Sequence, residues 1–523
     1  MKKLILFSLF ALSFSFISAN DNQKAIEYFT FGLTNPSKEI LLNNLKTGTL
    51  SPQQQAEAYY YLGEIYFLEQ KKDSALYYYQ QAPDYVFNII GQAKLNINES
   101  EKTLSDIASK NKKDMAVQYA VIKAYLDNNL IEKASQKIAE AKKANPTSPY
   151  ILTLEGNIFA KNKEYGKAVG AYEQAIYFDS KFKEPYVKIA RIYANSNMAS
   201  AIDAMQRLLS ADPTSFLPYR ETGEIYYENN RFADAVKAYT KYMDNEKYVS
   251  SDYPKYASML FFSGDFNKSM EITEKGLKED PNNLVLNRLL MYNLYELKKH
   301  PEGLAHADNF MKKERKEFIA LDHIYHARLL IENKQREEAI AQYQKALELD
   351  LAKISIYKEM AEVYELLEQY DKAIENYNKF IANAGNQVTV ADYFLLGQTY
   401  YSASTATTNA QQKNEYARTA DSIFAYVAEK TPNSYLGNFW RARTNTMLDP
   451  ETEQGLAKPY YEAAILLLNK DNARDVKPLI ECYRYLGYYY YLKNDVLTSK
   501  QYWNNILELD PKNETAINAL REM

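Results

Sequence analysis

The sequence is short of cysteine, histidine, glycine and proline, and each shortage excludes something. It contains one cysteine, Cys482, and four histidines among 523 residues, so an intramolecular disulfide and the usual Cys/His zinc frameworks are ruled out. The 16 glycines and 16 prolines fall well below average usage, which is roughly 7% and 5%. Because turn-rich β structure depends on these residues, their scarcity favours long helices.

Charge of either sign is also not in excess. The 63 basic and 67 acidic side chains leave a net charge of −4, with a pI near 5.9. Nucleic-acid binding depends on clustered Lys and Arg, so we expect no nucleic-acid partner. The sequence has no Gly-rich phosphate loop, HExxH or GxSxG motif. We therefore predict a protein that is not an enzyme and binds no cofactor or metal.

The only long apolar run lies at the start of the chain. Lys2 and Lys3 precede an uncharged stretch, residues 4–17, which is followed by Ser18 and Ala19. This order is typical of a secretory signal peptide, and the run is too short to span a bilayer comfortably. We expect residues 1–19 to be removed on export. No later segment reaches 18 consecutive apolar residues, so we predict no transmembrane segment.

The rest of the chain repeats with a period of about 34 residues. Small residues recur at Gly156, Ala190, Gly223 and Ala257, at spacings of 34, 33 and 34. We call each of these small residues an anchor. Each anchor has companions 3, 12, 16 and 19 positions later, mostly aromatic, small, tyrosine and small in that order. Around Gly63 and Gly156 these are Tyr66, Ala75, Tyr79 and Ala82, and Phe159, Ala168, Tyr172 and Ala175.

The spacing predicts a helix, a short turn and a second antiparallel helix in each repeat. The anchor and the small residue twelve positions later let the two helices touch, and the aromatic residues fill the space beside that contact. Prolines 24 positions after an anchor, at Pro146, Pro281 and Pro511, would end the second helix. One pair cannot bury its own apolar face, so the pairs are expected to stack.

This pattern resembles the tetratricopeptide repeat (TPR) family, from about residue 56 to 523. The resemblance implies an all-α, right-handed superhelical solenoid of about 13 antiparallel helix pairs. We expect a degenerate helical cap over residues 20–55, the solenoid over 56–512, and a closing helix over 513–523. Two repeats are longer than the others, and the extra residues near 402–416 and 448–456 are predicted to be loops.

The 48 tyrosines are only partly explained by the repeat offsets. The resemblance implies that positions three before an anchor, and one, four or five after it, face the concave surface. Tyr and Arg often dominate binding interfaces, so we predict a partner-binding face, although the same residues could merely fill wide helix faces. The predicted set is Tyr60, Phe67, Arg220, Tyr227, Phe394, Tyr401, Arg484, Tyr488 and Tyr491.

Two further patterns leave their meaning open. All four histidines lie between His300 and His326; His326 precedes an anchor and is expected to be buried, with a metal site as the less favoured alternative. The triplets beginning at Asp73 and Asp421 resemble an O-glycosylation acceptor of exported Bacteroidota proteins, with Ser74 and Ser422 as acceptors. A helix-capping role is favoured for both triplets.

The sequence as a whole favours a non-catalytic scaffold or adaptor that binds a protein partner on its concave surface. Export places it in the periplasm of a Gram-negative bacterium, and an association with an envelope complex at the outer membrane stays open. The rival hypothesis is a glycan-binding protein that stacks sugars on concave aromatic side chains. Known proteins of that kind carry a lipid-anchoring Cys after the signal peptide, and this sequence has none there.

Overall fold

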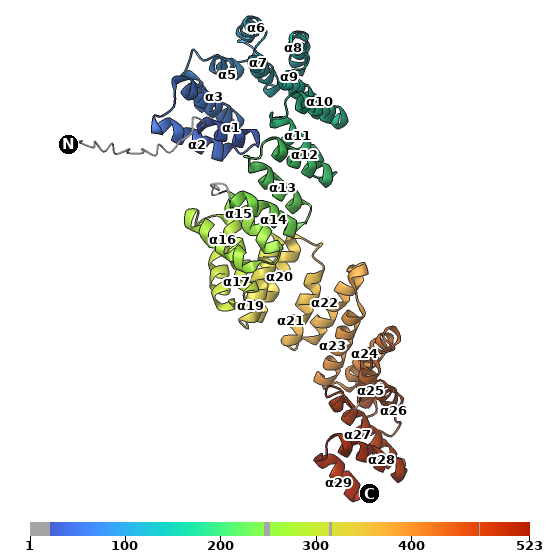
Figure 1. Ribbon diagram of the computed structural model, residues 1–523. Helices are drawn as coiled ribbons and strands as arrows, with labels where there is room; N and C mark the ends of the chain where they lie inside the picture. The colour runs from blue at the N-terminus through green and yellow to red at the C-terminus, as the bar shows by residue number, and fades with distance from the viewer. Residues whose placement is uncertain (1–20, 245–250, 313–315, 470) are drawn as a thin grey trace, which may run out of the picture. The chain divides into compact units, whose positions relative to one another are not determined.

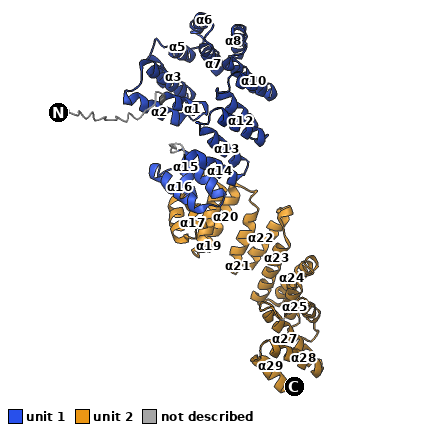
Figure 2. Ribbon diagram, in the orientation of Figure 1, with its two compact units in different colours: residues 1–289 blue, residues 290–523 orange. Residues whose placement is uncertain are grey.

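The computed structural model describes residues 21–244, 251–312, 316–469 and 471–523. The expected signal peptide, residues 1–19, lies outside this range. The described residues form 29 α-helices and one short 3-10 helix, with no strand among them (Figure 1). None of these helices is long and apolar enough to cross a membrane. The chain divides into two compact units, residues 1–289 and 290–523 (Figure 2).

Unit 1 consists of successive helices joined by short turns. Its helices are α1 (Asp21–Thr30), α2 (Thr34–Thr47), α3 (Pro52–Leu68), α4 (Lys72–Gln80), α5 (Val86–Leu95), α6 (Glu101–Lys110), α7 (Met115–Asp127), α8 (Ile131–Ala144), α9 (Pro149–Lys161), α10 (Tyr165–Phe178), α11 (Glu184–Tyr193), α12 (Met198–Ala211), α13 (Leu217–Glu228), α14 (Phe232–Met243), α15 (Asp252–Phe262) and α16 (Phe266–Glu279). The boundary between the units falls within α17 (Leu284–Glu296).

Unit 2 continues the same arrangement. Its helices are α18 (His300–Met311), α19 (Ala320–Glu332), α20 (Arg336–Leu349), α21 (Ser355–Leu366), α22 (Tyr370–Asn383), the 3-10 helix Gly385–Gln387, α23 (Val390–Ala406), α24 (Ala410–Lys430), α25 (Leu436–Leu448), α26 (Lys458–Ile465), α27 (Val476–Leu492), α28 (Val496–Leu509) and α29 (Glu514–Glu522). This series of paired helices confirms the all-α repeat fold that the sequence predicts.

The anchors work as the spacing predicts, because an aromatic ring of the second helix occupies the space beside each glycine anchor, and at Gly63, Gly156 and Gly223 this ring is a tyrosine. A Cβ added to Gly63 would lie 2.2 Å from the ring of Tyr79, and one added to Gly156 would lie 2.4 Å from the ring of Tyr172. Both tyrosines are buried. The tyrosines sixteen positions after an anchor are therefore core residues.

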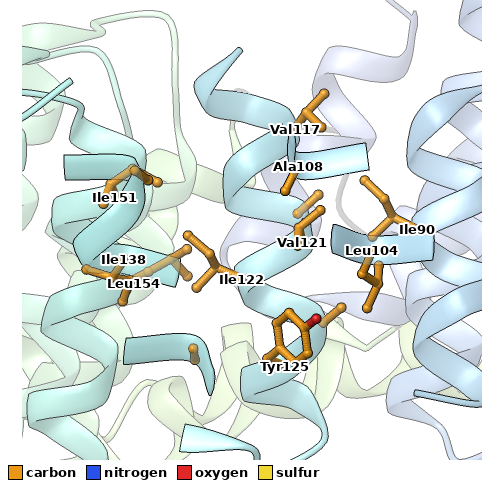
Figure 3. Packing of buried hydrophobic residues seen from close by; sticks show 14 of the residues in the cluster. Ile90, Leu104, Ala108, Val117, Val121, Ile122, Tyr125, Ile138, Ile151 and Leu154 are labelled. Carbon is orange, nitrogen blue, oxygen red and sulfur yellow. The ribbon is translucent and has the colours of Figure 1, made fainter. Parts of the chain in front are cut away.

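The core runs from one helix pair to the next. In one cluster, Ile90 of α5, Leu104 of α6, Val121 of α7, Ile138 of α8 and Leu154 of α9 pack together, although they come from five successive helices (Figure 3). At the C-terminal end, α29 covers the last pair through the buried Ala516, which joins a cluster with Trp503 and Ile506. Helix α29 thus covers apolar surface of the preceding helix pair.

In nine of the helix pairs, the turn between the two helices contains a residue in the left-handed backbone conformation at a common position. Its position is constant, seven residues after the anchor, and its φ lies between 57° and 87°. Eight of these nine residues are not glycine: Gln70, Asn129, Lys163, Asn230, Lys298, Lys334, Glu368 and Asn494, with Gly264 as the ninth. Side chains at this position bring strain that a glycine would avoid.

The predicted loop near 402–416 is wrong, because these residues extend two helices. Helix α23 continues to Ala406 and α24 starts at Ala410, so only residues 407–409 connect them. The Asn409 side chain caps α24 by accepting from the backbone N–H groups of Gln411 and Gln412. Asp421 and Ser422 consequently lie inside α24 and do not cap its start, which corrects the expected capping role. Asp73 also follows the first residue of α4, and the N-cap position there is Lys71.

The second lengthened segment does form a loop, between α25 and α26. One buried carboxylate organises it: Oδ2 of Asp449 accepts from the backbone N–H groups of Gln454, Gly455 and Leu456 at 3.0, 2.7 and 3.3 Å. Gly455 has φ 69°, and a Cβ added there would lie 2.3 Å from the ring of Tyr489. Glycine is therefore required at this position by both backbone and packing.

Candidate functional site

The two N-terminal candidates of the predicted face are packed against their neighbours. The ring of Tyr60 contacts the rings of Tyr61, Tyr79 and Phe87 at centroid distances of 5.3, 6.4 and 5.5 Å. Nζ of Lys94 lies 4.1 Å from the ring centroid of Phe67. Both candidate side chains are only half-exposed. The structure thus gives Tyr60 and Phe67 a packing role.

Beside them lies a buried group of charges that the sequence analysis missed. Nζ of Lys94 lies 2.5 Å from Glu64 and 3.3 Å from Asp127, and Nζ of Lys123 lies 3.4 Å and 2.6 Å from the same carboxylates. Burial alone would raise the pKa of Glu64, but Lys94 and Lys123 outweigh it and lower that pKa to about 2. The ions satisfy one another, so this network stabilises the inside of unit 1. A lysine within the otherwise uncharged stretch 86–95 was the available signal.

Arg220 is likewise an internal residue and is not free to bind a partner. Its side chain is 4% exposed, its Nε lies 2.9 Å from Oδ1 of Asp252, and its Nη1 lies 2.7 Å from Oε1 of Glu224. The hydroxyl groups of Tyr239 and Tyr242 donate to the same Asp252 carboxylate at 2.8 Å each. This buried aspartate therefore ties α13 and α14 to the start of α15.

Tyr227 belongs to a small aromatic cluster at the turns of two neighbouring pairs. Its ring lies 5.6 Å from that of Phe232 and 6.2 Å from that of Phe262. Phe262 is 41% exposed, and Tyr227 is half-buried. The cluster is partly accessible but contains no charged side chain.

The unit 2 candidates form a continuous row across three first helices. The indole of Trp440 on α25 meets the rings of Phe394 and Tyr401 from α23 edge-on, at 6.0 and 5.2 Å. The guanidinium of Arg443 lies 4.8 Å from the Trp440 ring. The same guanidinium pairs with Glu481 on α27, with both nitrogen–oxygen distances under 3 Å.

Arg484, Tyr488 and Tyr491 continue this row along α27. With Glu481 they lie at intervals of three, four and three residues, which places them on one helix stripe. Arg484 is exposed, and Tyr488 and Tyr491 are each 44% exposed. We call the whole set the α23–α27 row; its members are Phe394, Tyr401, Trp440, Arg443, Arg484, Tyr488 and Tyr491.

Exposed apolar side chains border the C-terminal end of the row. Leu492 ends α27 at 39% exposure, and the first turn of α28 adds Val496 at 39% and Leu497 at 74%. A concentration of large apolar side chains in water is typical of an interaction surface.

Two members of the row, Trp440 and Arg443, are absent from the set predicted from the sequence. Their repeat has Ala442 as its anchor, 45 residues from both Gly397 and Gly487, so a period of 34 residues does not indicate it.

Two of the four histidines, His323 and His326, and the cysteine are buried. His323 Nδ1 lies 2.8 Å from Gln342 Oε1, and His326 Nε2 lies 3.1 Å from Asp308 Oδ1. Burial lowers the pKa of His326 against the opposing effect of Asp308. Within the described ranges no group of three or more His, Cys, Asp or Glu side chains is placed to hold a metal ion. Cys482 is completely buried, which raises its thiol pKa.

Comparison with known proteins identifies the class that this fold defines. Tetratricopeptide repeat family models match residues 57–85, 192–248 and 326–353. The chain is 31% identical to the C-terminal part of a TPR repeat-containing protein from Cytophaga hutchinsonii, over 51% of this chain and 99% of that one, with a TM-score of 0.44. The protein belongs to the tetratricopeptide repeat family.

Two more distant relatives carry the same repeat. A TPR repeat-containing protein of Methanocaldococcus jannaschii is 22% identical over 332 residues, which is 57% of either chain, so this chain spans little more than half of that relative. A tetratricopeptide repeat protein from Parabacteroides merdae is 17% identical over 50% of this chain and 98% of its own, with a TM-score of 0.33.

Proposed function

We propose that the protein is a non-catalytic adaptor of the bacterial cell envelope and binds a partner protein along the α23–α27 row. TPR proteins generally mediate protein–protein interactions, and scaffold proteins of this family are typically not enzymes. The observation that carries the proposal is the exposure of Tyr488 and Tyr491 beside an arginine on one helix stripe. Tyrosine and arginine supply most of the binding energy in many interfaces.

The row suits a polypeptide because it combines apolar contact with polar ends. The rings offer large area at low conformational cost, and the tyrosine hydroxyl and Arg484 supply hydrogen bonds that fix orientation. The Arg443–Glu481 pair and the edge-on ring contacts hold the row in place before a partner arrives. Such preorganisation lowers the entropy cost of binding.

The cellular setting rests on the first residues of the chain. The charged start, apolar run and small residues of positions 1–19 support export to the periplasm. N-terminal sequencing of the envelope-associated protein tests this part of the proposal, and we expect it to begin at Asn20. A protein that is recovered from the cytoplasm with Met1 intact would contradict it.

The double variant Tyr488→Ala with Tyr491→Ala tests the binding row. Each hot-spot truncation typically costs about 2 kcal/mol or more, which is some thirtyfold in affinity. We expect the variant to lose a stoichiometric partner in affinity isolation from the native envelope, with an unchanged melting temperature. The matched control is Tyr165→Ala with Tyr177→Ala on α10, where the tyrosines are 51% and 83% exposed.

Three outcomes would count against the proposal. They are an unchanged partner list in the α27 variant, equal loss in the α10 control, and a collapsed melting temperature, which would make the tyrosines structural. Recovery on polysaccharide alone, without a protein partner, would instead support glycan binding.

A further inference from the structure

Helix α1 makes contacts far along the chain that the repeat pattern does not predict. Residues of α1 and its C-terminal end contact α11 and the residue before it, the loop after α12, and α14. The contacting residues lie 156 to 214 positions apart in sequence. Other contacts in a solenoid join neighbouring repeats. This face of α11 and α14 is therefore already covered by a segment of the same chain.

The centre of this contact is a carboxylate. Glu27 of α1 lies 2.5 Å from Nζ of Lys183, just before α11, and the hydroxyl of Ser215 donates to the same carboxylate. Lys183 also pairs with Asp212 at 2.7 Å. The side chains of Glu27 and Lys183 are only 18% and 23% exposed, so this ion pair is partly shielded from water and salt.

The C-terminal end of α1 is bound as well. Nη2 of Arg191 on α11 donates to the backbone carbonyl of Phe31 at 2.5 Å. The last carbonyls of a helix have no partner within it and carry partial negative charge. A guanidinium placed there recognises the helix end itself. Helix α1 thus occupies the part of the α11 surface where Arg191 lies.

A tyrosine pair completes the contact. The hydroxyl groups of Tyr28 on α1 and Tyr242 on α14 are 3.4 Å apart, and Tyr242 donates to the buried Asp252. Tyr28 is 1% exposed. On its other side α1 packs on its own hairpin, since Ala25 joins a core cluster with Leu41 of α2 and Ala58 of α3. Helix α1 therefore bridges the first repeats and the later ones.

We propose that α1 is an intramolecular ligand of unit 1, seated on a surface that otherwise accepts an amphipathic helix with the same pattern. That pattern is an acidic residue followed by a tyrosine, with the helix ending within a few residues. The surface supplies Lys183 and Ser215 for the acid, Tyr242 for the tyrosine and Arg191 for the helix end. This site is separate from the α23–α27 row, so either proposal can fail alone.

Carbodiimide crosslinking of the wild-type chain tests directly whether α1 is bound to this surface. The reagent joins a carboxylate to an ammonium group in contact, and we expect mass spectrometry to find Glu27 linked to Lys183. A mixture of isotope-labelled and unlabelled chains should give links within one copy only. The absence of this link, or links mainly between copies, would overturn the proposal without any variant being needed.

Peptide binding tests whether this surface accepts a separate copy of the α1 segment once α1 itself is displaced. The probe is a fluorescent synthetic peptide of residues 20–33, and the full chain is used as wild type and as Glu27→Lys. A tethered helix has an effective concentration of the order of millimolar, so it shuts out a micromolar peptide about a thousandfold. We expect Glu27→Lys, which sets two ammonium groups against each other, to bind the peptide at least about thirtyfold more tightly than wild type does.

Matched variants separate this effect from general damage. Glu39→Lys makes the same charge change at an exposed position of α2 and should bind no more peptide than wild type. Adding Arg191→Ala to Glu27→Lys should abolish the gain in peptide affinity. Adding Lys183→Glu to Glu27→Lys should restore the binding of α1 to this surface and so exclude the peptide again. Equal peptide binding by wild type, Glu27→Lys and Glu39→Lys chains of unchanged helicity would overturn the proposal.

Discussion

Single residues in the turns of the repeats carry a cost that the helices around them outweigh. A left-handed residue with a side chain is less favourable than glycine by roughly 1 kcal/mol, and eight repeats place such a residue seven positions after the anchor. Lys163 and Glu368 have φ 63° and 58° there. The packing of the two helices fixes the backbone conformation of the turn. That conformation only partly determines which residue type occurs there.

The first prediction concerns these turns. Lys163→Gly and Glu368→Gly should each raise the free energy of unfolding by up to about 1 kcal/mol, because relief of strain exceeds the added entropy of the unfolded chain. The matched control is Gly264→Ala, where φ is 87° and an added Cβ meets nothing within 4 Å. It should destabilise by a similar amount. Thermal unfolding measures all three, and a lower melting temperature for both glycine variants would contradict the prediction.

The second prediction concerns the pH dependence of Glu64. Its pKa is lowered from 4.5 to about 2 in the folded protein, so the unfolded state binds the proton more tightly. Stability from this group is therefore complete above about pH 4.5 and is lost as the pH falls towards 2. We expect Glu64→Gln to lower stability by about 3 kcal/mol or more at pH 6, since Lys94 loses its partner, and by much less at pH 3.

Urea unfolding at pH 6, 4 and 3 measures this difference. The control is Glu101→Gln, which removes an exposed pair with Lys133 and should cost under about 1 kcal/mol at every pH. A gap between wild type and Glu64→Gln that stays constant across this range would show that the charge of Glu64 does not matter.

At the scale of helices, the sequence predicts the pairs well and their extensions poorly. The periodic anchors specify where two helices touch, so the pairs around Gly63 and Gly156 could be predicted with their core tyrosines. The Ser, Thr and Asn content of residues 402–416 favours a loop. Alanine is the best helix former, however, and Ala403 packs in the core, so the segment prolongs α23 and α24.

The candidate site was predictable only where the period holds. Arg484, Tyr488 and Tyr491 follow from the anchor Gly487, and the structure places all three on an exposed stripe. Trp440 and Arg443 belong to a repeat of different length, so the period of 34 residues does not indicate them. Arg220 fits the pattern of a concave residue, but its buried partner Asp252 lies 32 residues away, and no local pattern reports such a contact.

At the scale of the whole molecule, damage should stay close to its source except where α1 connects distant parts. Ala235 on α14 and Ala373 on α22 occupy the same offset, twelve residues after their anchors, and both are completely buried. The backbone carbonyl of Ala235 lies 3.2 Å from where a Cβ on Gly223 would stand. A larger side chain must push the two helices of its pair apart.

The third prediction compares two overpacked variants. Ala235→Trp and Ala373→Trp should each destabilise their own pair by about 1 to 3 kcal/mol. Hydrogen exchange should show loosening of α13 to α15 in the first variant and of α21 to α23 in the second. Only Ala235→Trp should also loosen α1, because Tyr242 on the displaced helix contacts Tyr28. Uniform loosening along the chain, or none, would contradict this expectation.

The contacts of α1 also have a consequence for synthesis, because α1 is made long before the residues that bind it. Glu27 and Ser215 are 188 residues apart, and a ribosome that adds about 5 to 20 residues per second needs roughly 10 to 40 seconds to make that stretch. Throughout this interval the residues that bind Tyr28 and the Glu27 carboxylate are not yet complete. Helix α1 is thus made well before the surface that it binds, and for that time its binding residues are open to a chaperone.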